Sequence, residues 1–414
     1  MHILLGYGTT NKALAEKLCP CVIFDDSFLD SSFDSFGNLL KPAKELKEFL
    51  EKNENLTIIT SPGIPPQNKM IIESQNAVES KKAKLLSEYD FFAASMPPSV
   101  WISGTNGKTT TTQILAYLLK DFGALSGGNI GTPLASLDTN AKLWILETSS
   151  FTLHYTNIAK PMLYLLLPLS EDHITWHGDF SEYVNAKLKP ILSLREKEIA
   201  ILPESLKEHK FCKESLANLI FYKNTQDLAR IFNLNLDSIN FKEPFLLDAT
   251  LALSACEILF STQNYELLNS FKIGAHKIEE FRDSKNRLWV DDSKGTNLDA
   301  TICAINSYKD KEILLILGGD DKGADLTPLF EAIKKQNIKI YAIGSNTQKL
   351  HTLAQAQNTP CKPCYNLKVA VDAIKNDFKD STQIALLSPA AASLDQFKSY
   401  KDRGEQFKKF ALES

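Results

Sequence analysis

Short apolar runs alternate along the chain with longer stretches in which apolar residues recur at helical spacing. Residues 2–5, 21–24 and 56–60 are such runs, and residues 42–51 carry a helical pattern between the last two. Each run ends in glycine, hydroxyl or charged residues. Alternating strands and helices predict an α/β fold with mainly parallel sheets.

The same alternation continues to the end of the chain. The further predicted strands are 100–102, 141–146, 163–167, 288–290, 312–317, 338–343 and 383–387, and the further helices are 113–120, 180–190, 244–260 and 298–307. Pro97-Pro98 reads as a linker. We therefore predict three α/β domains, at residues 1–97, 98–273 and 274–414.

Composition narrows the class of protein. A chain of 414 residues with 43% hydrophobic residues has ample core for two or three domains. A net charge of −4 gives no electrostatic footprint for nucleic acid. No apolar run is long enough to span a membrane, and the N-terminus lacks signal-peptide features. We expect a cytoplasmic protein without membrane insertion, whose seven cysteines are buried or surface thiols, the Cys361-x-x-Cys364 spacing included.

The strongest chemical signal is a glycine loop between a predicted strand and a predicted helix. It reads Gly104-Thr105-Asn106-Gly107-Lys108-Thr109. Backbone N–H groups of such a loop and the following helix N-terminus bind phosphate oxygens, a lysine adds charge, and a hydroxyl can hold Mg²⁺. The eight-residue P-loop would need glycine at position 102, where this chain has isoleucine. The alternative is a glycine-rich turn that only caps the helix.

Polar groups follow other predicted strands. Asn129 lies in a glycine loop, Glu147 ends one strand, and His173 follows another. Ligands of open α/β sheets bind at the carboxyl ends of strands, so these groups suggest Mg²⁺ coordination and substrate orientation. Glu147 could instead cap a helix and His173 could be a core histidine. Gly6-x-Gly8 before a helix is a weak nucleotide signal but a natural diphosphate site.

Seven segments occur together in an order that resembles the Mur ligase family. They are Gly104-Thr105-Asn106-Gly107-Lys108-Thr109-Thr110, Gly128-Asn129-Ile130-Gly131, Glu147-Thr148-Ser149-Ser150-Phe151, Glu171-Asp172-His173, Tyr183-x-x-Ala186-Lys187, Asp292-Ser293-Lys294-x-Thr296-Asn297 and Ser388-Pro389-x-x-x-Ser393-Leu394-Asp395-Gln396-Phe397. The phosphate loop alone would also fit folylpolyglutamate synthases. The last two segments are similar to those of the D-glutamate-adding members.

The resemblance implies a central P-loop-type ATPase domain between Rossmann-like N- and C-terminal domains, the last closing over the other two. It implies that ATP phosphorylates the carboxylate of UDP-N-acetylmuramoyl-L-alanine, and that D-glutamate attacks the acyl phosphate to form an amide. This is a step of peptidoglycan precursor synthesis. The implied ligands are ATP, two Mg²⁺ ions and the two substrates, on a monomer.

The resemblance also implies roles for single residues. Lys108, Glu147, His173 and Lys187 are the implied catalytic group, and Thr109, Glu147, His173 and Lys187 the implied Mg²⁺ ligands, with Lys187 as a carbamate. From sequence physics alone Lys187 would be a solvated charge. The implied ATP-binding residues are Gly104, Thr105, Asn106, Gly107, Lys108, Thr109, Thr110, Asp248, Lys277 and Asp292. The UDP substrate would meet Thr9, Thr10, Gly63, Asn129 and His173, and D-glutamate would meet Thr296, Lys322, Ser393, Leu394 and Tyr400.

Four departures from the family pattern stand out. The expected His-Asn-x-x-Asn stretch is Pro244-Phe245-Leu246-Leu247-Asp248, Lys277 replaces arginine, Tyr400 replaces phenylalanine, and Asp26-Ser27 replaces a Thr-Arg pair. Lysine lacks the bidentate geometry of arginine. We expect rearranged nucleotide contacts with activity retained. Another amino-acid ligase of the family, or a non-catalytic nucleotide-gated binding protein, is the alternative.

Overall fold

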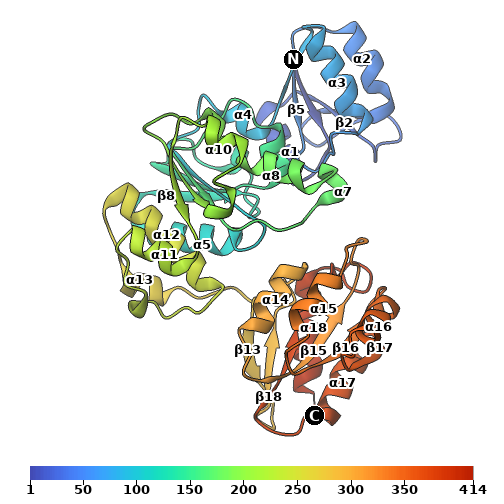
Figure 1. The fold of residues 1–414 in the computed structure, drawn as a ribbon. Coiled ribbons are helices and arrows are strands. Elements are labelled where there is room, and N and C mark those ends of the chain that lie inside the picture. The colour runs from blue at the N-terminus through green and yellow to red at the C-terminus, as the bar shows by residue number, and fades with distance from the viewer. Residues whose placement is uncertain (414) are drawn as a thin grey trace. The chain divides into compact units, whose positions relative to one another are not determined.

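The computed structural model describes residues 1–413, and its strands form three six-stranded sheets (Figure 1). The sheets take their strands from residues 2–86, 99–222 and 279–387. Contacts divide the chain into two compact units. The first unit comprises Met1–Phe241 and Phe245–Phe271, and the second comprises Lys242–Pro244 and the chain from Lys272 onward. The predicted α/β class with parallel sheets is confirmed.

The first sheet has the order β3-β4-β2-β1-β5-β6 and is parallel except between β3 and β4. Its strands are β1 (His2–Leu5), β2 (Val22–Asp25), β3 (Ser32–Phe33), β4 (Leu39–Pro42), β5 (Leu56–Thr60) and β6 (Ala83–Leu86). The helices in this part are α1 (Thr9–Leu18), α2 (Leu46–Lys52), α3 (Lys69–Glu79) and α4 (Glu88–Phe92).

The predicted helix over residues 42–51 begins later than expected. Pro42 is the last residue of β4, a 3-10 turn covers Ala43–Glu45, and α2 begins at Leu46. Proline has no N–H, so it is tolerated at a strand end, where no further ladder bond is needed. The helix predicted from the spacing of the apolar residues is therefore present only in the second half of this segment.

The second sheet has the order β12-β11-β10-β7-β9-β8 and is parallel throughout. Its strands are β7 (Ser99–Ser103), β8 (Ala124–Gly128), β9 (Leu143–Glu147), β10 (Leu163–Leu166), β11 (Ile199–Pro203) and β12 (Asn218–Tyr222). The helices are α5 (Lys108–Leu118), α6 (Ser150–Tyr155), α7 (Ile174–His177), α8 (Phe180–Leu188), α9 (Pro190–Ser193), α10 (Lys210–Glu214), α11 (Thr225–Ile231), α12 (Phe245–Phe260) and α13 (Tyr265–Ser270).

The third sheet has the order β13-β14-β18-β15-β16-β17, with only β13 antiparallel to its neighbour. Its strands are β13 (Glu279–Arg282), β14 (Leu288–Asp291), β15 (Glu312–Gly318), β16 (Ile338–Ile343), β17 (Cys361–Tyr365) and β18 (Gln383–Leu387). The helices are α14 (Leu298–Asn306), α15 (Thr327–Ile333), α16 (Thr347–Ala356), α17 (Leu367–Asp377) and α18 (Tyr400–Leu412).

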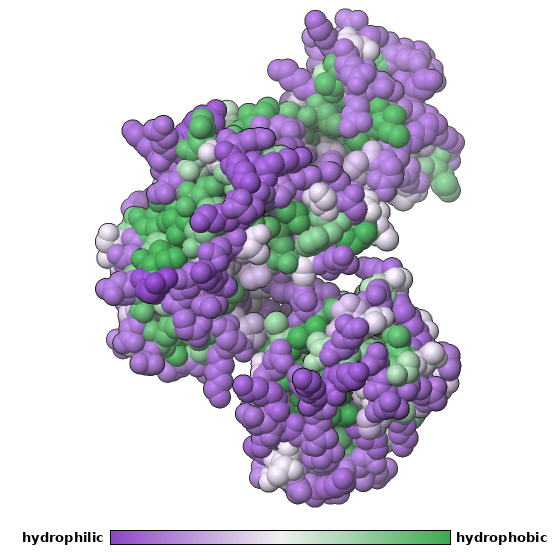
Figure 2. Space-filling model, in the orientation of Figure 1, coloured by the Kyte–Doolittle hydropathy of each residue, from purple (hydrophilic) through white to green (hydrophobic). Residues whose placement is uncertain are grey.

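The cores explain why the strands are almost continuously apolar. Parallel sheets are covered on both faces, so residues that point to either face are buried. Trp101, Trp144 and Trp289 are fully buried members of these cores. Hydrophilic residues cover most of the face drawn in Figure 2, with apolar residues visible in patches. Among residues 1–413, no helix is long and apolar enough to cross a membrane.

The cysteines of the described chain show no metal-like or redox-like pairing. Cys361 and Cys364 stand three apart on β17, which places their side chains on opposite faces of the sheet. Cys361 packs beside one core and Cys364 within another. Cys19 in the first unit and Cys303 in the second are exposed.

Candidate functional site

The phosphate loop lies between β7 and α5, as predicted, and two of its glycines are required by packing. Gly104 has φ +144°, and a Cβ there would come within 2.5 Å of the Leu167 Cβ atom. Gly107 has φ +83°, and a Cβ there would come within 2.3 Å of the Asp248 Oδ1 atom. Asp248, from α12, also accepts a hydrogen bond from the Thr111 hydroxyl at 3.2 Å. This predicted ATP-side residue therefore packs against the loop.

Lys108 begins α5 and lies over the loop that precedes it. Its ammonium donates hydrogen bonds to the carbonyl oxygens of Gly104 at 2.8 Å and Thr105 at 2.7 Å. Asn106 precedes it in the loop, and Thr109 and Thr110 lie in the first turn of α5. A helix N-terminus with a lysine and hydroxyls at its first turn has the chemistry of a phosphate site.

Lys187 lies beneath the same loop and is not the solvated charge that sequence physics alone suggested. Its side chain is about 1% exposed, and its amine donates to Gly104 O at 2.9 Å and Ser103 Oγ at 3.2 Å. Burial lowers the pKa of the Lys187 ammonium well below its usual value, and the neighbouring Lys108 charge adds to this. Both effects favour the neutral amine over the ammonium.

Glu147 ends β9 beside Asn129, and the two side chains are joined. The Asn129 amide donates to Glu147 Oε1 at 2.8 Å. Glu147 is 2% exposed, and within residues 1–413 its second oxygen, Oε2, is buried without a hydrogen-bond partner. A buried carboxylate oxygen that lacks a partner is costly, so it suits a site that receives a cation.

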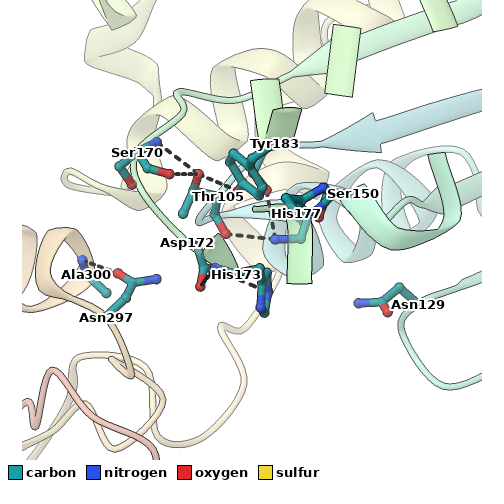
Figure 3. A network of polar contacts seen from close by, with 12 residues as sticks. Thr105, Asn129, Ser150, Ser170, Asp172, His173, His177, Tyr183, Asn297 and Ala300 are labelled. Atoms are coloured by element: carbon teal, nitrogen blue, oxygen red, sulfur yellow. Dashed lines mark hydrogen bonds and ion pairs between the residues drawn. The ribbon is translucent and has the colours of Figure 1, made fainter. Parts of the chain in front are cut away.

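Tyr183 links the phosphate loop to the segment that carries His173. The Tyr183 hydroxyl lies 2.8 Å from the Thr105 hydroxyl, which also accepts from the Ser170 N–H at 3.0 Å (Figure 3). The Lys187 ammonium lies 4.9 Å from the Tyr183 ring centroid. Tyr183 was recognised only as part of a motif, because nothing in the sequence shows where a tyrosine hydroxyl points.

His173 precedes α7 with a left-handed backbone, φ +55°. Its ring lies 4.6 Å from that of Phe151 in α6, and its Nε2 atom is 3.5 Å from the Asp172 carboxylate. The ring is exposed, which excludes the alternative that it is a core histidine. Glu147, likewise, does not cap α6, since the Ser149 side chain does so.

Three of the five predicted UDP-side residues, Thr9, Thr10 and Gly63, lie on segments that follow strands of the first sheet. Thr9 and Thr10 begin α1 directly after Gly8, and Gly63 is exposed in the loop after β5. A cavity brings part of this group together with Asn129. Its lining is Thr10, Thr60, Pro62, Ser87, Glu88, Tyr89, Gly128, Asn129, Thr152 and Tyr155. The Asn68 side-chain amide, in the loop after β5, donates a hydrogen bond to Asp26 Oδ2 at 3.3 Å.

In the second unit, Asp292 follows β14 and is almost completely buried. It accepts a hydrogen bond from Ser388 Oγ at 2.6 Å and from the Ile278 N–H at 3.3 Å. Burial raises the pKa of its carboxyl to about 7. Lys277 precedes Ile278, so these two predicted ATP-side residues lie in neighbouring segments.

The predicted D-glutamate residues stand on three loops of the second unit and at the start of α18. Thr296 and Lys322 are exposed, Ser393 is buried, Leu394 is 71% exposed, and Tyr400 begins α18. The Ser293 hydroxyl donates to Tyr400 O at 2.8 Å, which joins the loop after β14 to the start of α18. Arg403 of α18, which the sequence did not single out, joins the loop after β14 to the loop after β18. Its buried guanidinium binds Ser293 and the carbonyl oxygens of Ala391 and Ala392.

One acidic group of the second unit has the spacing of a metal site. His276, Glu279 and Asp291 bring ligand atoms within 4.8 Å of one another. However, His276 Nδ1 is already hydrogen-bonded to Asp291 Oδ2 at 2.7 Å, and the Lys408 ammonium lies 2.6 Å from Glu279. The lysine supplies the positive charge, so we interpret this group as an ion-pair cluster.

Proteins of known name align with almost the whole of this chain. The UDP-N-acetylmuramoylalanine–D-glutamate ligase of Campylobacter jejuni is 50% identical over 98% of both chains, and that of Helicobacter pylori is 46% identical over 99% of both. The chain belongs to the Mur ligase family. Residues 102–243 of this Mur ligase match the Mur ligase middle domain, which includes the phosphate loop, Glu147, His173 and Lys187.

Solved structures support the fold of this Mur ligase. Crystal structures of MurF from Acinetobacter baumannii and from Thermotoga maritima, the latter in complex with ADP, align with TM-scores of 0.59 and 0.57. They cover 100% and 87% of this chain and 93% and 95% of their own, at 12% and 15% identity. At such identity, the similarity concerns the fold alone.

Proposed function

We propose that this Mur ligase uses ATP to join D-glutamate to UDP-N-acetylmuramoyl-L-alanine in peptidoglycan precursor synthesis. The observation that carries the proposal is the near-complete alignment, at 46–50% identity, with relatives named as this ligase. The phosphate loop, the buried Lys187 and the Glu147–Asn129 pair supply groups suited to the chemistry. An amide ligase must turn a carboxylate, a poor electrophile, into an acyl phosphate that has a good leaving group.

The phosphate loop would bind ATP and Lys108 would neutralise the transferred phosphoryl group. In phosphoryl transfer, proteins contribute mainly positioning and positive charge around the developing polyanion. The Lys108 ammonium now binds two loop carbonyl oxygens, so it is held where phosphate oxygens would approach the loop. Asn129 would orient the UDP substrate, since its amide lines the cavity next to Glu147.

The residues at the loop also fit Mg²⁺. Thr109, Glu147, His173 and Lys187 are the proposed ligands, and the orphan Glu147 Oε2 atom provides the hard oxygen that Mg²⁺ prefers. An ammonium cannot ligate a cation, but a neutral lysine amine can react with CO₂ and become an anionic carbamate. The lowered pKa of Lys187 favours that neutral amine. When bound, Mg²⁺ would neutralise charge on the phosphate oxygens.

The second substrate is proposed to meet the second unit. Thr296, Lys322, Ser393, Leu394 and Tyr400 would receive D-glutamate, whose two carboxylates require cations and hydrogen-bond donors. Asp292 and Lys277, on the same unit, would meet ATP. Arg403 would act as a positioning residue, because it binds the Ser293 and Ala391–Ala392 loops from within the core.

We further propose that the chain acts as a cytoplasmic monomer of three domains, 1–97, 98–273 and 274–414. Each proposed domain holds one six-stranded sheet. Sedimentation velocity checks the monomer, which would run as a single species of 46.2 kDa.

A phosphate-release assay tests the function. It supplies ATP, Mg²⁺ and UDP-N-acetylmuramoyl-L-alanine, and offers D-glutamate, L-glutamate, L-lysine and diaminopimelate in turn. We expect release that depends on D-glutamate. Preference for a diamino acid would contradict the proposed substrate, and no release with any amino acid would indicate a non-catalytic binding protein.

A further inference from the structure

Trp176 of α7 occupies the centre of an aromatic group in the first unit. Its ring stacks on Phe151 of α6, with centroids 4.6 Å apart and planes 27° apart. His173 packs against the same Phe151 at 4.6 Å. The edges of His154 and Tyr155 meet the indole at 5.2 Å and 6.0 Å. Trp176 and His173 therefore share one aromatic neighbour. A displacement of either ring would shift the other ring through Phe151.

The same aromatic group is hydrogen-bonded to the loop that follows β5 of the first sheet. The Trp176 indole N–H donates a long hydrogen bond to Gly63 O, at 3.4 Å. The Tyr155 hydroxyl donates to Ile64 O, the next carbonyl along, at 2.7 Å. Two adjacent carbonyl groups of this loop are thus held by side chains of α6 and α7, which belong to the second sheet's part of the chain.

The position of His173 depends on this packing. The residue directly precedes a helix of only four residues, and a helix that short has no stability of its own. Its left-handed backbone, φ +55°, is also an unfavourable conformation for a residue other than glycine. Side-chain contacts must therefore hold this turn in place. Trp176 supplies such contacts through its packing against Phe151, His154 and Tyr155.

We propose that Trp176 is a positioning residue that couples the Gly63 loop to His173. The inference rests on the proposed function, in which Gly63 and His173 both meet the UDP substrate. When the substrate orders the Gly63 loop, the indole N–H and the stack on Phe151 fix the His173 ring. The contacts with Gly63 and Phe151 make Trp176 chiefly a contributor to UDP-substrate binding, and loss of the stack would also lower kcat because His173 is a proposed Mg²⁺ ligand.

The wild-type protein offers a direct measurement. Trp101, Trp144 and Trp289 are fully buried, whereas Trp176 is half-buried, so acrylamide quenches Trp176 preferentially. We expect UDP-N-acetylmuramoyl-L-alanine, added without ATP or Mg²⁺, to reduce this quenching by about half. Addition of ATP alone leaves it unchanged.

Variants separate the hydrogen bond from the ring stack. Trp176→Phe keeps an aromatic ring and loses the N–H, and we expect the KM for the UDP substrate to rise about fivefold with kcat near the wild-type value. Trp176→Leu loses the stack as well, and we expect a rise of about 20-fold with a lower kcat. The KM for ATP stays within about twofold in both. Phe260→Leu, which removes a partly exposed ring at the end of α12, is the control and leaves all three constants unchanged.

The outcomes distinguish the inference from the function on which it rests. If the wild-type enzyme ligates D-glutamate but substrate leaves Trp176 quenching unchanged, or if both variants keep the wild-type KM, the coupling is wrong and the function stands. Equal increases in the KM for the UDP substrate and the KM for ATP would indicate a general structural role for Trp176. That result would also overturn the proposed coupling. Absence of ligation by the wild-type enzyme overturns the proposed function itself.

Discussion

At the scale of single residues, Lys187 is the side chain whose environment differs most from that of an ordinary lysine. It is buried between Ser103, Gly104 and Tyr183, and its ammonium donates to a hydroxyl and a backbone carbonyl oxygen instead of a carboxylate. We expect Lys187→Ala to lower kcat about 1,000-fold in the phosphate-release assay, because an anionic ligand and its charge are lost. Formate or acetate should restore part of the activity by supplying a carboxylate in the space left.

A second lysine on the same segment is the matched control for that variant. The Lys189 ammonium is also partly buried and donates to His154 O at 2.6 Å, but it does not touch the phosphate loop. Lys189→Gln should keep most of the activity and show no response to formate. Full activity of Lys187→Ala would refute the carbamate.

Glu88 provides a test of pH dependence. Burial raises the pKa of its carboxyl from 4.5 to about 7 in the folded protein, against hydrogen bonds from the Ala135 and Leu134 N–H groups that lower it. The folded state thus holds the proton more tightly than the unfolded state. This contribution to stability is complete below pH 4.5 and is lost as the pH rises through about 7.

The variant Glu88→Gln removes this titration while keeping the size of the side chain. Between pH 5 and 8 we expect the free energy of unfolding of the wild-type protein to fall relative to that of the variant by about 3 kcal/mol. Urea unfolding at several pH values measures the difference. Parallel curves for the two proteins would show that Glu88 is ionised in the folded state.

At the scale of elements, α4 is fastened to the loop after α6 by one buried carboxylate. Asp90 accepts hydrogen bonds from the N–H groups of Asn157, Ile158 and Ala159, at 2.7–3.1 Å. An asparagine would turn an amide toward one of these donors. We therefore expect Asp90→Asn to lower the free energy of unfolding by about 2–3 kcal/mol.

Urea denaturation with an exposed control checks this value. Asp138 accepts from the Asn140 N–H at the surface, so Asp138→Asn should cost less than about 0.5 kcal/mol. Equal effects of the two substitutions would mean that Asp90 does not anchor α4.

Elements also show what the sequence could and could not predict. The strands before the polar loops were predictable, because buried parallel strands are apolar throughout and are followed by glycine, hydroxyl or charged residues. Short edge strands such as β3 and the strand β17, with its lysine and proline, lack that signal. The family resemblance identified Lys187 as a site residue. Its burial, the orientation of Tyr183 and the hydrogen bonds of Arg403 depend on contacts between segments far apart in the chain, which the sequence does not show.

At the scale of the whole molecule, the division into two units predicts two unfolding transitions. The proposed UDP-substrate residues Thr9, Thr10, Gly63, Asn129 and His173 all belong to the first unit. At 100 times its Kd, the UDP substrate should therefore stabilise that unit by about 2.7 kcal/mol and raise its Tm by about 5 °C. D-glutamate should act on the second unit only.

Calorimetry resolves the two transitions, and fluorescence assigns them. Among the described residues, Trp289 is the sole tryptophan of the second unit, so Trp289→Phe removes that unit's signal and leaves the first. One transition that responds equally to either substrate would contradict the independence of the units.

The two exposed cysteines fall one in each unit, and this has a practical consequence. Cys19 and Cys303 are accessible to maleimide dyes, while burial raises the pKa of Cys21, Cys212 and Cys256 and slows their reaction. The natural sequence thus carries its own pair of labelling positions. A donor and an acceptor dye on these thiols would act as a spectroscopic ruler between the units, and would follow their separation through each step of turnover.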